Sequence, residues 1–115
     1  MHSAMNEVGL GVWEWSPRTN LVRADPLAQK AFGMSCPEEG AMLIEFLSAL
    51  PAPDRRMMRT MLEKAILTNC PQDSVHKIGL TNHEAKARTR TLPVDLSATH
   101  GKSVVLCVTQ LISVM

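Results

Sequence analysis

The feature that most constrains this chain is the segment 8–33, where a hairpin pattern leads directly into a short helix. Apolar residues stand at every second position over residues 8–12, a period of two that predicts a pleated strand. The run SPRTN at residues 16–20 contains turn-forming residues and predicts a reversal of the chain. Residues 21–23 then resume an extended course, which completes the hairpin.

The helix that follows is bracketed by residues that favour its two ends. Asp25 is a suitable N-cap, and Pro26 is well placed as the first helical residue. Gly33 readily adopts the left-handed conformation that ends a helix. A hairpin that feeds a capped helix predicts a fold that mixes strands and helices.

The length and charge of the chain limit its fold and its partners. The 115 residues suffice for one domain with a single core. The 12 Lys and Arg and 11 Asp and Glu give a net charge of +1, which argues against a nucleic-acid partner because phosphate binding needs clustered positive charge. The longest uncharged run, 103–115, is shorter than the roughly 20 residues of a membrane-spanning helix. Residues 1–7 contain no apolar stretch typical of a signal peptide, so we expect no membrane segment in this chain.

The cysteines indicate the compartment. Cys36, Cys70 and Cys107 are far apart and odd in number. This pattern is typical of reduced thiols rather than of a disulfide framework. We therefore expect a cytoplasmic protein.

Two further helices are expected in the middle of the chain. A capping-box pattern at residues 35–38 and an imperfect apolar face predict a helix over 41–50. A longer helix is expected over 53–68, where apolar residues recur at spacings of three and four. Its cations Arg55, Arg56, Arg59 and Lys64 lie away from that stripe and form either a solvated face or an anion-binding patch.

The last third of the chain reads as strands. We expect strands over 74–81, 84–93 and 103–113, joined by a turn at 82–83 and a loop over 95–102. In the second of these strands Lys86, Arg88 and Arg90 alternate with Ala87, Thr89 and Thr91. One face of that strand is therefore charged, and the other carries small side chains that leave space beneath the helices. The final strand is apolar on both faces, which favours a central place in the sheet.

The order of these elements, together with several motifs, resembles a PAS domain, of the subgroup typical of bacterial sensor kinases and diguanylate cyclases. The segment WEWSPRTN at residues 13–20 resembles the W-x-W-D-x-x-T-(G/N) opening of that subgroup. Residues 26–33, residues 39–55 and the closing TQLIS at 109–113 resemble later family segments. Leu111 stands where the family commonly has an aspartate.

The resemblance implies an α+β fold: a five-stranded antiparallel sheet, with short helices and one longer helix covering one face and the first and last strands adjacent. It implies a PAS-like sensor domain over residues 8–115, preceded by an N-terminal extension over residues 1–7. The implied function is that of a sensory or protein-interaction module of a bacterial signalling protein, itself not an enzyme, which regulates a linked effector domain by a ligand- or partner-induced shift. A homodimer is expected through the outer face of the sheet.

Residues on the helix-covered face are the candidates for contact with a small ligand, whose identity the sequence leaves open. No cofactor and no metal site are expected. The cavity candidates are Trp13, Val22, Phe32, Met34, Phe46, Leu47, Met58, Leu62 and Ile78.

The alternative is a domain with bound haem or flavin that senses redox state or gas. The sequence NCPQ around Cys70 only echoes the reactive-cysteine segment of flavin photosensors and follows the long helix instead of preceding it. His76 could be a haem ligand, although a structural role is the simpler interpretation. Two residues apart on one strand, Trp13 and Trp15 share a face and either line the cavity or cover the outer sheet face. Glu14, between them, faces either the cavity or the solvent-exposed rim.

Overall fold

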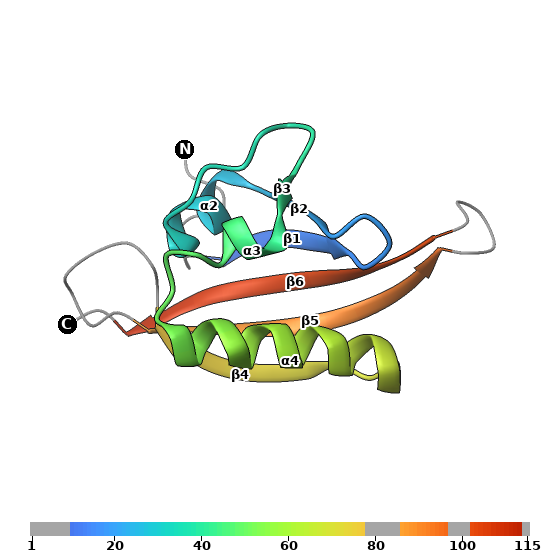
Figure 1. Ribbon diagram of the computed structural model, residues 1–115. Coiled ribbons are helices and arrows are strands. Elements are labelled where there is room, and N and C mark those ends of the chain that lie inside the picture. Colours follow the sequence, from blue (N-terminus) through green and yellow to red (C-terminus); the bar gives the residue numbers. More distant parts are fainter. Residues whose placement is uncertain (1–9, 78–85, 97–101, 114–115) are drawn as a thin grey trace, which may run out of the picture.

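The structure is a computed structural model that describes residues 10–77, 86–96 and 102–113. A single antiparallel sheet forms one layer, and the helices lie across one of its faces (Figure 1). The strands follow the order β3-β2-β1-β6-β5-β4. Their bounds, with those of the helices, are β1 Leu10–Ser16, β2 Leu21–Ala24, α2 Pro26–Phe32, β3 Ala41–Met42, α3 Leu43–Phe46, α4 Ala52–Thr68, β4 Gln72–Lys77, β5 Lys86–Leu96 and β6 Lys102–Ser113.

The first and last strands lie side by side at the centre of this sheet. β1 and β6 pair antiparallel from Leu10 opposite Gln110 to Trp15 opposite Val105. β6 also pairs with β5 on its other side, which confirms the central place expected for the apolar last strand. The predicted α+β fold, with helices over one face of an antiparallel sheet, is confirmed.

The caps read from the sequence hold α2 in place. Asp25 Oδ1 accepts a hydrogen bond from the backbone N–H of Ala28 at 2.8 Å, as an N-cap does. Asp25 Oδ2 accepts a second one from Val12 N–H at 3.0 Å, so the same carboxylate ties the helix to β1. Gly33 ends the helix with φ 71°.

The expected capping box at 35–38 and the continuous helix over 41–50 are wrong. Residues 34–40 form no helix, and Gly40, with φ 106°, brings the chain back beside β2. Ala41 and Met42 then pair with β2 as the two-residue strand β3, which makes six strands where five were expected. Their backbone groups therefore pair with a sheet edge, and only the single turn α3 remains helical.

The later elements follow the prediction with shifted ends. α4 begins one residue before the expected 53–68 and ends at residue 68 as expected, where Asn69 follows as the C-cap with φ 53°. β5 and β6 extend into the expected loop 95–102, because Asp95 pairs with Ser103 and Leu96 with Lys102. The proposed extension 1–7, the turn 82–83 and the end of the strand 74–81 lie outside the described residues.

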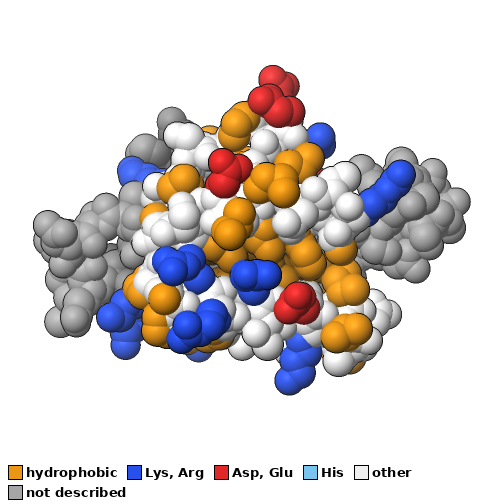
Figure 2. Space-filling model, viewed as in Figure 1, with side chains coloured by type: hydrophobic (Ala, Val, Ile, Leu, Met, Phe, Trp, Pro, Cys, Tyr) orange, Lys and Arg blue, Asp and Glu red, His pale blue; other side chains and the backbone are white. Residues whose placement is uncertain are grey.

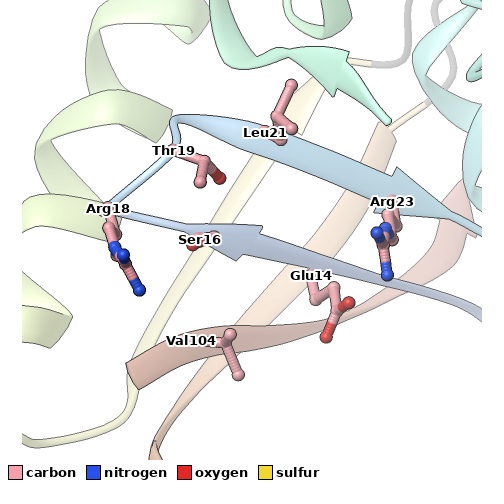
Figure 3. Close-up of a pocket in the computed structure, with 7 residues that line it drawn as sticks. All are labelled: Glu14, Ser16, Arg18, Thr19, Leu21, Arg23 and Val104. Atoms are coloured by element: carbon pink, nitrogen blue, oxygen red, sulfur yellow. The ribbon is translucent and has the colours of Figure 1, made fainter. Parts of the chain in front are cut away.

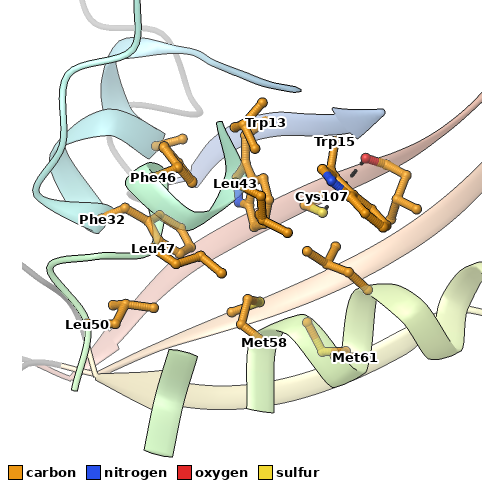
Figure 4. Packing of buried hydrophobic residues seen from close by; sticks show 14 of the residues in the cluster. Trp13, Trp15, Phe32, Leu43, Phe46, Leu47, Leu50, Met58, Met61 and Cys107 are labelled. Atoms are coloured by element: carbon orange, nitrogen blue, oxygen red, sulfur yellow. Dashed lines mark hydrogen bonds between the residues drawn. The ribbon is translucent and has the colours of Figure 1, made fainter. Parts of the chain in front are cut away.

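The core fills the space between the sheet and the helices (Figure 4). α4 contributes the apolar stripe that its spacing predicted, with Met58, Met61, Leu62 and Ala65 buried. α2 lies closest to the sheet where Gly11 faces it. A Cβ on Gly11 would stand 2.6 Å from Ala28 N and 2.9 Å from Ala28 Cα, so only glycine permits this approach.

We expect Gly11→Ala to lower the free energy of unfolding by about 1–3 kcal/mol, because the added methyl group must push α2 away from β1. Urea denaturation followed by circular dichroism measures the change. Ser16→Ala, at the far end of the same strand, is the control and should change stability by less than about 0.5 kcal/mol. Equal stability of the two variants would show that the contact between α2 and β1 is loose.

Candidate functional site

Eight of the nine cavity candidates lie on the helix-covered side of the sheet. The ninth, Ile78, lies outside the described residues. Met34 is partly buried and packs against the edge of the core. The fully buried candidates are Trp13, Val22, Phe32, Phe46, Leu47, Met58 and Leu62.

Three aromatic rings occupy the centre of this region. The Trp13 ring lies 5.1 Å from Phe32 and 5.2 Å from Phe46, measured between centroids, and Phe32 stacks on Phe46 at 4.7 Å. Figure 4 shows these rings pointing toward one another from β1, α2 and α3. Trp15 is buried on the same side, and its Nε1–H donates to Asn20 Oδ1 at 2.9 Å. Both tryptophans therefore belong to the core and not to the outer sheet face.

A chain of hydrogen bonds runs from Trp13 across four strands. Trp13 Nε1 lies 2.9 Å from Thr109 Oγ1 on β6, which lies 2.7 Å from Thr89 Oγ1 on β5. Thr89 Oγ1 lies 2.6 Å from His76 Nε2 on β4, and His76 Nδ1 lies 2.9 Å from the carbonyl oxygen of Lys77. We call Trp13, Thr109, Thr89 and His76 the relay. All four are buried.

The chemistry of the two ends sets the direction of the relay. The Lys77 carbonyl only accepts, so His76 carries its proton on Nδ1 and offers Nε2 as an acceptor when neutral. Thr89 then donates to His76, Thr109 donates to Thr89, and Trp13 donates to Thr109. Every group is satisfied in one consistent direction.

The surroundings of His76 favour its neutral form. Burial lowers the pKa of His76 below its ordinary value of 6.5, against smaller raising effects of the Lys77 carbonyl and the Asp54 carboxylate. The Phe32 ring lies 5.5 Å away and contributes to the apolar surroundings. The structural interpretation of this histidine is the one that the geometry supports.

His76, the candidate haem ligand, already forms hydrogen bonds through its ring. Both ring nitrogens of His76 already hold hydrogen bonds, so an axial bond to haem iron would have to break one of them. Within the described ranges, no group of three or more His, Cys, Asp or Glu side chains is placed to hold a metal ion.

The three cysteines differ in their surroundings. Cys70 is exposed beyond the end of α4, away from the buried rings. Cys36 is partly buried, and its Sγ donates to the Val22 carbonyl at 3.1 Å. Burial raises the pKa of the Cys107 thiol well above its ordinary value, which keeps that group protonated and weakly nucleophilic.

The opposite face of the sheet carries the charged residues. Arg88 and Arg90 are exposed on β5, and Arg88 Nε lies 3.7 Å from Asp73 Oδ1. Glu14 pairs across strands with Arg23 on this face and not in the core. A pocket of about 340 Å³ lies beside them, lined by Glu14, Ser16, Arg18, Thr19, Leu21, Arg23 and Val104 (Figure 3).

Comparison with solved structures identifies the fold. A sensory box histidine kinase/response regulator from Burkholderia thailandensis has a TM-score of 0.67 and 17% identity, over 95% of this chain and 81% of that one. A domain of a putative light and redox sensing histidine kinase from Haloarcula marismortui has a TM-score of 0.70 and 15% identity, over 90% of each chain. An RNA-binding Light-Oxygen-Voltage receptor has a TM-score of 0.70 and 15% identity, over 90% of this chain and 29% of that one.

This chain has the PAS fold. The resemblance read from the sequence motifs is thereby confirmed at the level of the fold, and the subgroup stays a prediction. No protein-family model and no curated protein matches the sequence. Among the described helices of this chain, none has both the length and the apolar character needed to cross a bilayer.

The relay is the part of the PAS core that sequence reasoning missed. The alternation of Ala87, Thr89 and Thr91 with charged residues predicted small side chains facing the helices, and these three residues are indeed buried. The expectation of space beneath the helices did not consider that the threonine hydroxyl groups form hydrogen bonds there. Thr89 uses its hydroxyl to join His76 to Thr109.

Thr89→Val should lower the free energy of unfolding by about 1–3 kcal/mol, because it leaves buried His76 Nε2 without a donor and the Thr109 hydroxyl hydrogen without an acceptor. Thr89→Ser keeps the hydroxyl and should retain more stability than Val does, although it loses a methyl group. Chemical denaturation of the three proteins at one pH gives the comparison. A valine variant as stable as the parent would contradict the relay.

The stability of the protein should fall as the pH falls from 7.5 toward 5.5. The pKa of His76 is lowered in the folded state, so the unfolded chain takes up its proton first, near pH 6.5. The contribution of neutral His76 is therefore complete above that pH and is lost as the pH drops toward the lower folded-state pKa. Unfolding free energies measured across this range should show a slope that His76→Gln reduces. An unchanged slope in His76→Gln would assign the dependence to other groups.

Proposed function

We propose that this chain is a sensory and protein-interaction PAS module of a bacterial signal-transduction protein in the cytoplasm. In this proposal the module is regulatory and not catalytic, and it controls a covalently linked effector domain. Support comes from the fold, because solved structures that share it carry the printed names of histidine kinases and of a Light-Oxygen-Voltage receptor. The observation that carries the proposal is this fold together with a dense aromatic and methionine core on its helix-covered face.

In the proposed mechanism, a small apolar ligand enters the core between the helices and the sheet. It would have to part the Trp13, Phe32 and Phe46 rings, whose centroids lie 4.7–5.2 Å apart. Met58 on α4 is unbranched and adjusts its shape readily, which favours such an opening. The ligand would select an arrangement of α2 and α3 that is rare in its absence, and the effector would respond to that change in population.

The outer face of the sheet is the proposed dimer surface. An apolar stripe crosses this face on β1, β6 and β5, beside the cations Arg88 and Arg90. Several of its side chains are only half-buried in the single chain. Pairing two copies through this stripe would remove it from water. The outer stripe consists of Val12, Leu92, Val94, Leu106 and Val108.

Native mass spectrometry of the purified chain tests both parts of this proposal at once. We expect a dimer, and a bound small molecule would appear as added mass that disappears on denaturation. Val108→Glu places a charge in the outer stripe and should shift the dimer to monomer.

The control is Thr60→Glu, which adds the same charge at an exposed position on α4 and should leave the dimer intact. Circular dichroism verifies that both variants fold. A chain that stays monomeric and carries no added mass would contradict the proposal. A visible absorbance band in the purified protein would favour the alternative, a redox or gas sensor with bound haem or flavin.

A further inference from the structure

The helix-covered side of the molecule also carries a groove between α3 and α4. It consists of two adjoining hollows of about 200 Å³ and 140 Å³, which share Ile44 and Arg59 in their linings. Leu43 and Leu47 of the α3 region complete the floor, and α4 forms the opposite bank. We call this the α3–α4 groove.

The floor of the groove is apolar, and one of its side chains is exposed to solvent. Ile44 is 65% exposed, whereas Leu43 and Leu47 on either side of it in the groove are buried. An exposed isoleucine on a convex surface is unremarkable in a soluble protein. Here it stands in a hollow, where an apolar side chain of a partner would cover it on several sides.

The bank on α4 is strongly basic at one end. Arg55, Arg56 and Arg59 line the smaller hollow, and Arg55 is held in place because its Nη1 donates to the Leu50 carbonyl at 2.8 Å. Figure 2 shows Lys and Arg side chains gathered beside hydrophobic ones on this face. Within residues 10–77, 86–96 and 102–113, the salt bridge formed joins Arg88 to Asp73 on the opposite face, so none of these three arginines pairs with a carboxylate there.

The other end of the groove adds an acidic side chain. Glu63 lines the larger hollow together with Arg59. Arg56 and Glu63 are seven positions apart on α4, which corresponds to about 10 Å along the helix axis. Over about two helical turns the groove therefore presents arginines at one end, Ile44 opposite Arg59 where the two hollows meet, and Glu63 at the other end.

We propose that the α3–α4 groove docks a short amphipathic segment of a partner protein, with acidic residues at one end and an apolar residue at its centre. The carboxylates bind Arg56 and Arg59, the apolar side chain covers Ile44, and a Lys or Arg at the other end meets Glu63. Pairing of guanidinium groups with carboxylates gives the segment its orientation as well as its affinity. This surface lies on the opposite side of the sheet from the outer stripe, so the docking of the segment does not need the dimer.

Three synthetic helical peptides of equal length provide the test. The matched probe has Glu residues at one end, Leu at its centre and Lys at the other end. The scrambled probe has the same composition with its charges interleaved, and the third probe has Leu replaced by Ser. Anisotropy of fluorescein-labelled peptides measures binding, and we expect the order matched, then scrambled or Leu-free.

Variants of the chain identify the site. The double variant Arg56→Gln with Arg59→Gln should weaken the matched probe by about tenfold or more, because it removes both carboxylate partners. Ile44→Ser should also weaken it, with little effect on folding since Ile44 is exposed. The charge-matched control, Arg88→Gln with Arg90→Gln, removes two cations from the opposite face and should leave binding unchanged.

Several results would overturn the inference. One is the absence of binding by the matched probe, and another is equal loss of binding in the groove and control double variants. Inorganic phosphate is tested alone: if it binds saturably at Arg56 and Arg59 while the peptide does not, the groove is a phosphate site. The outcome of the native mass spectrometry on the outer stripe is independent of each of these results.

Discussion

The Trp13 side chain is the point on which most of the architecture depends. Its ring packs edge-on against Phe32 of α2 and at a tilt against Phe46 of α3, while its N–H donates to Thr109 on β6. One residue of β1 thus joins two helices and the neighbouring central strand. The hydrogen bond fixes the orientation of the indole in its plane, and the two phenylalanine rings fix its tilt. The pairing of Trp13 with Cys107 in the central strands sets where this side chain enters the core.

The polar groups beneath the helices are tolerated because they satisfy one another. A single buried threonine hydroxyl without a partner would destabilise the fold, but Thr109 and Thr89 bond to each other and to Trp13 and His76. The direction of the hydrogen bonds in the relay depends on a neutral His76. A second proton on that ring would turn Nε2 into a donor, and Thr89 would then have to reverse its own hydrogen bond. A ligand that enters this region must replace these bonds or leave them intact, so the relay restricts the polarity of what the core accepts.

The sequence was sufficient to predict the helices whose boundaries or buried face are determined by residues within or next to the helix itself. Asp25, Pro26 and Gly33 act within one helix, and the stripe on α4 needs only its own spacing, so α2 and α4 were predicted close to their observed bounds. β3 was missed because two residues carry no period, and its existence depends on the edge of β2 brought near by Gly40. The relay was missed for a related reason. Its members come from four strands, and which threonine lies opposite which depends on a register that no single strand reveals.

α3 connects the core to the α3–α4 groove. Its four residues are too few to form a stable helix alone, so contacts on both sides set its position. Phe46 faces the buried rings, whereas Ile44 faces the groove. The Asn20 carbonyl accepts a hydrogen bond from Leu43 N–H at 3.1 Å, and its side chain accepts one from Trp15, so the β1–β2 turn also bears on α3. Any displacement of α3 therefore moves the floor of the groove and the stacked rings together. A partner in the groove would consequently change the affinity of the core for its ligand through α3. Thermodynamic linkage requires the ligand to change the affinity of the groove for its partner by the same factor.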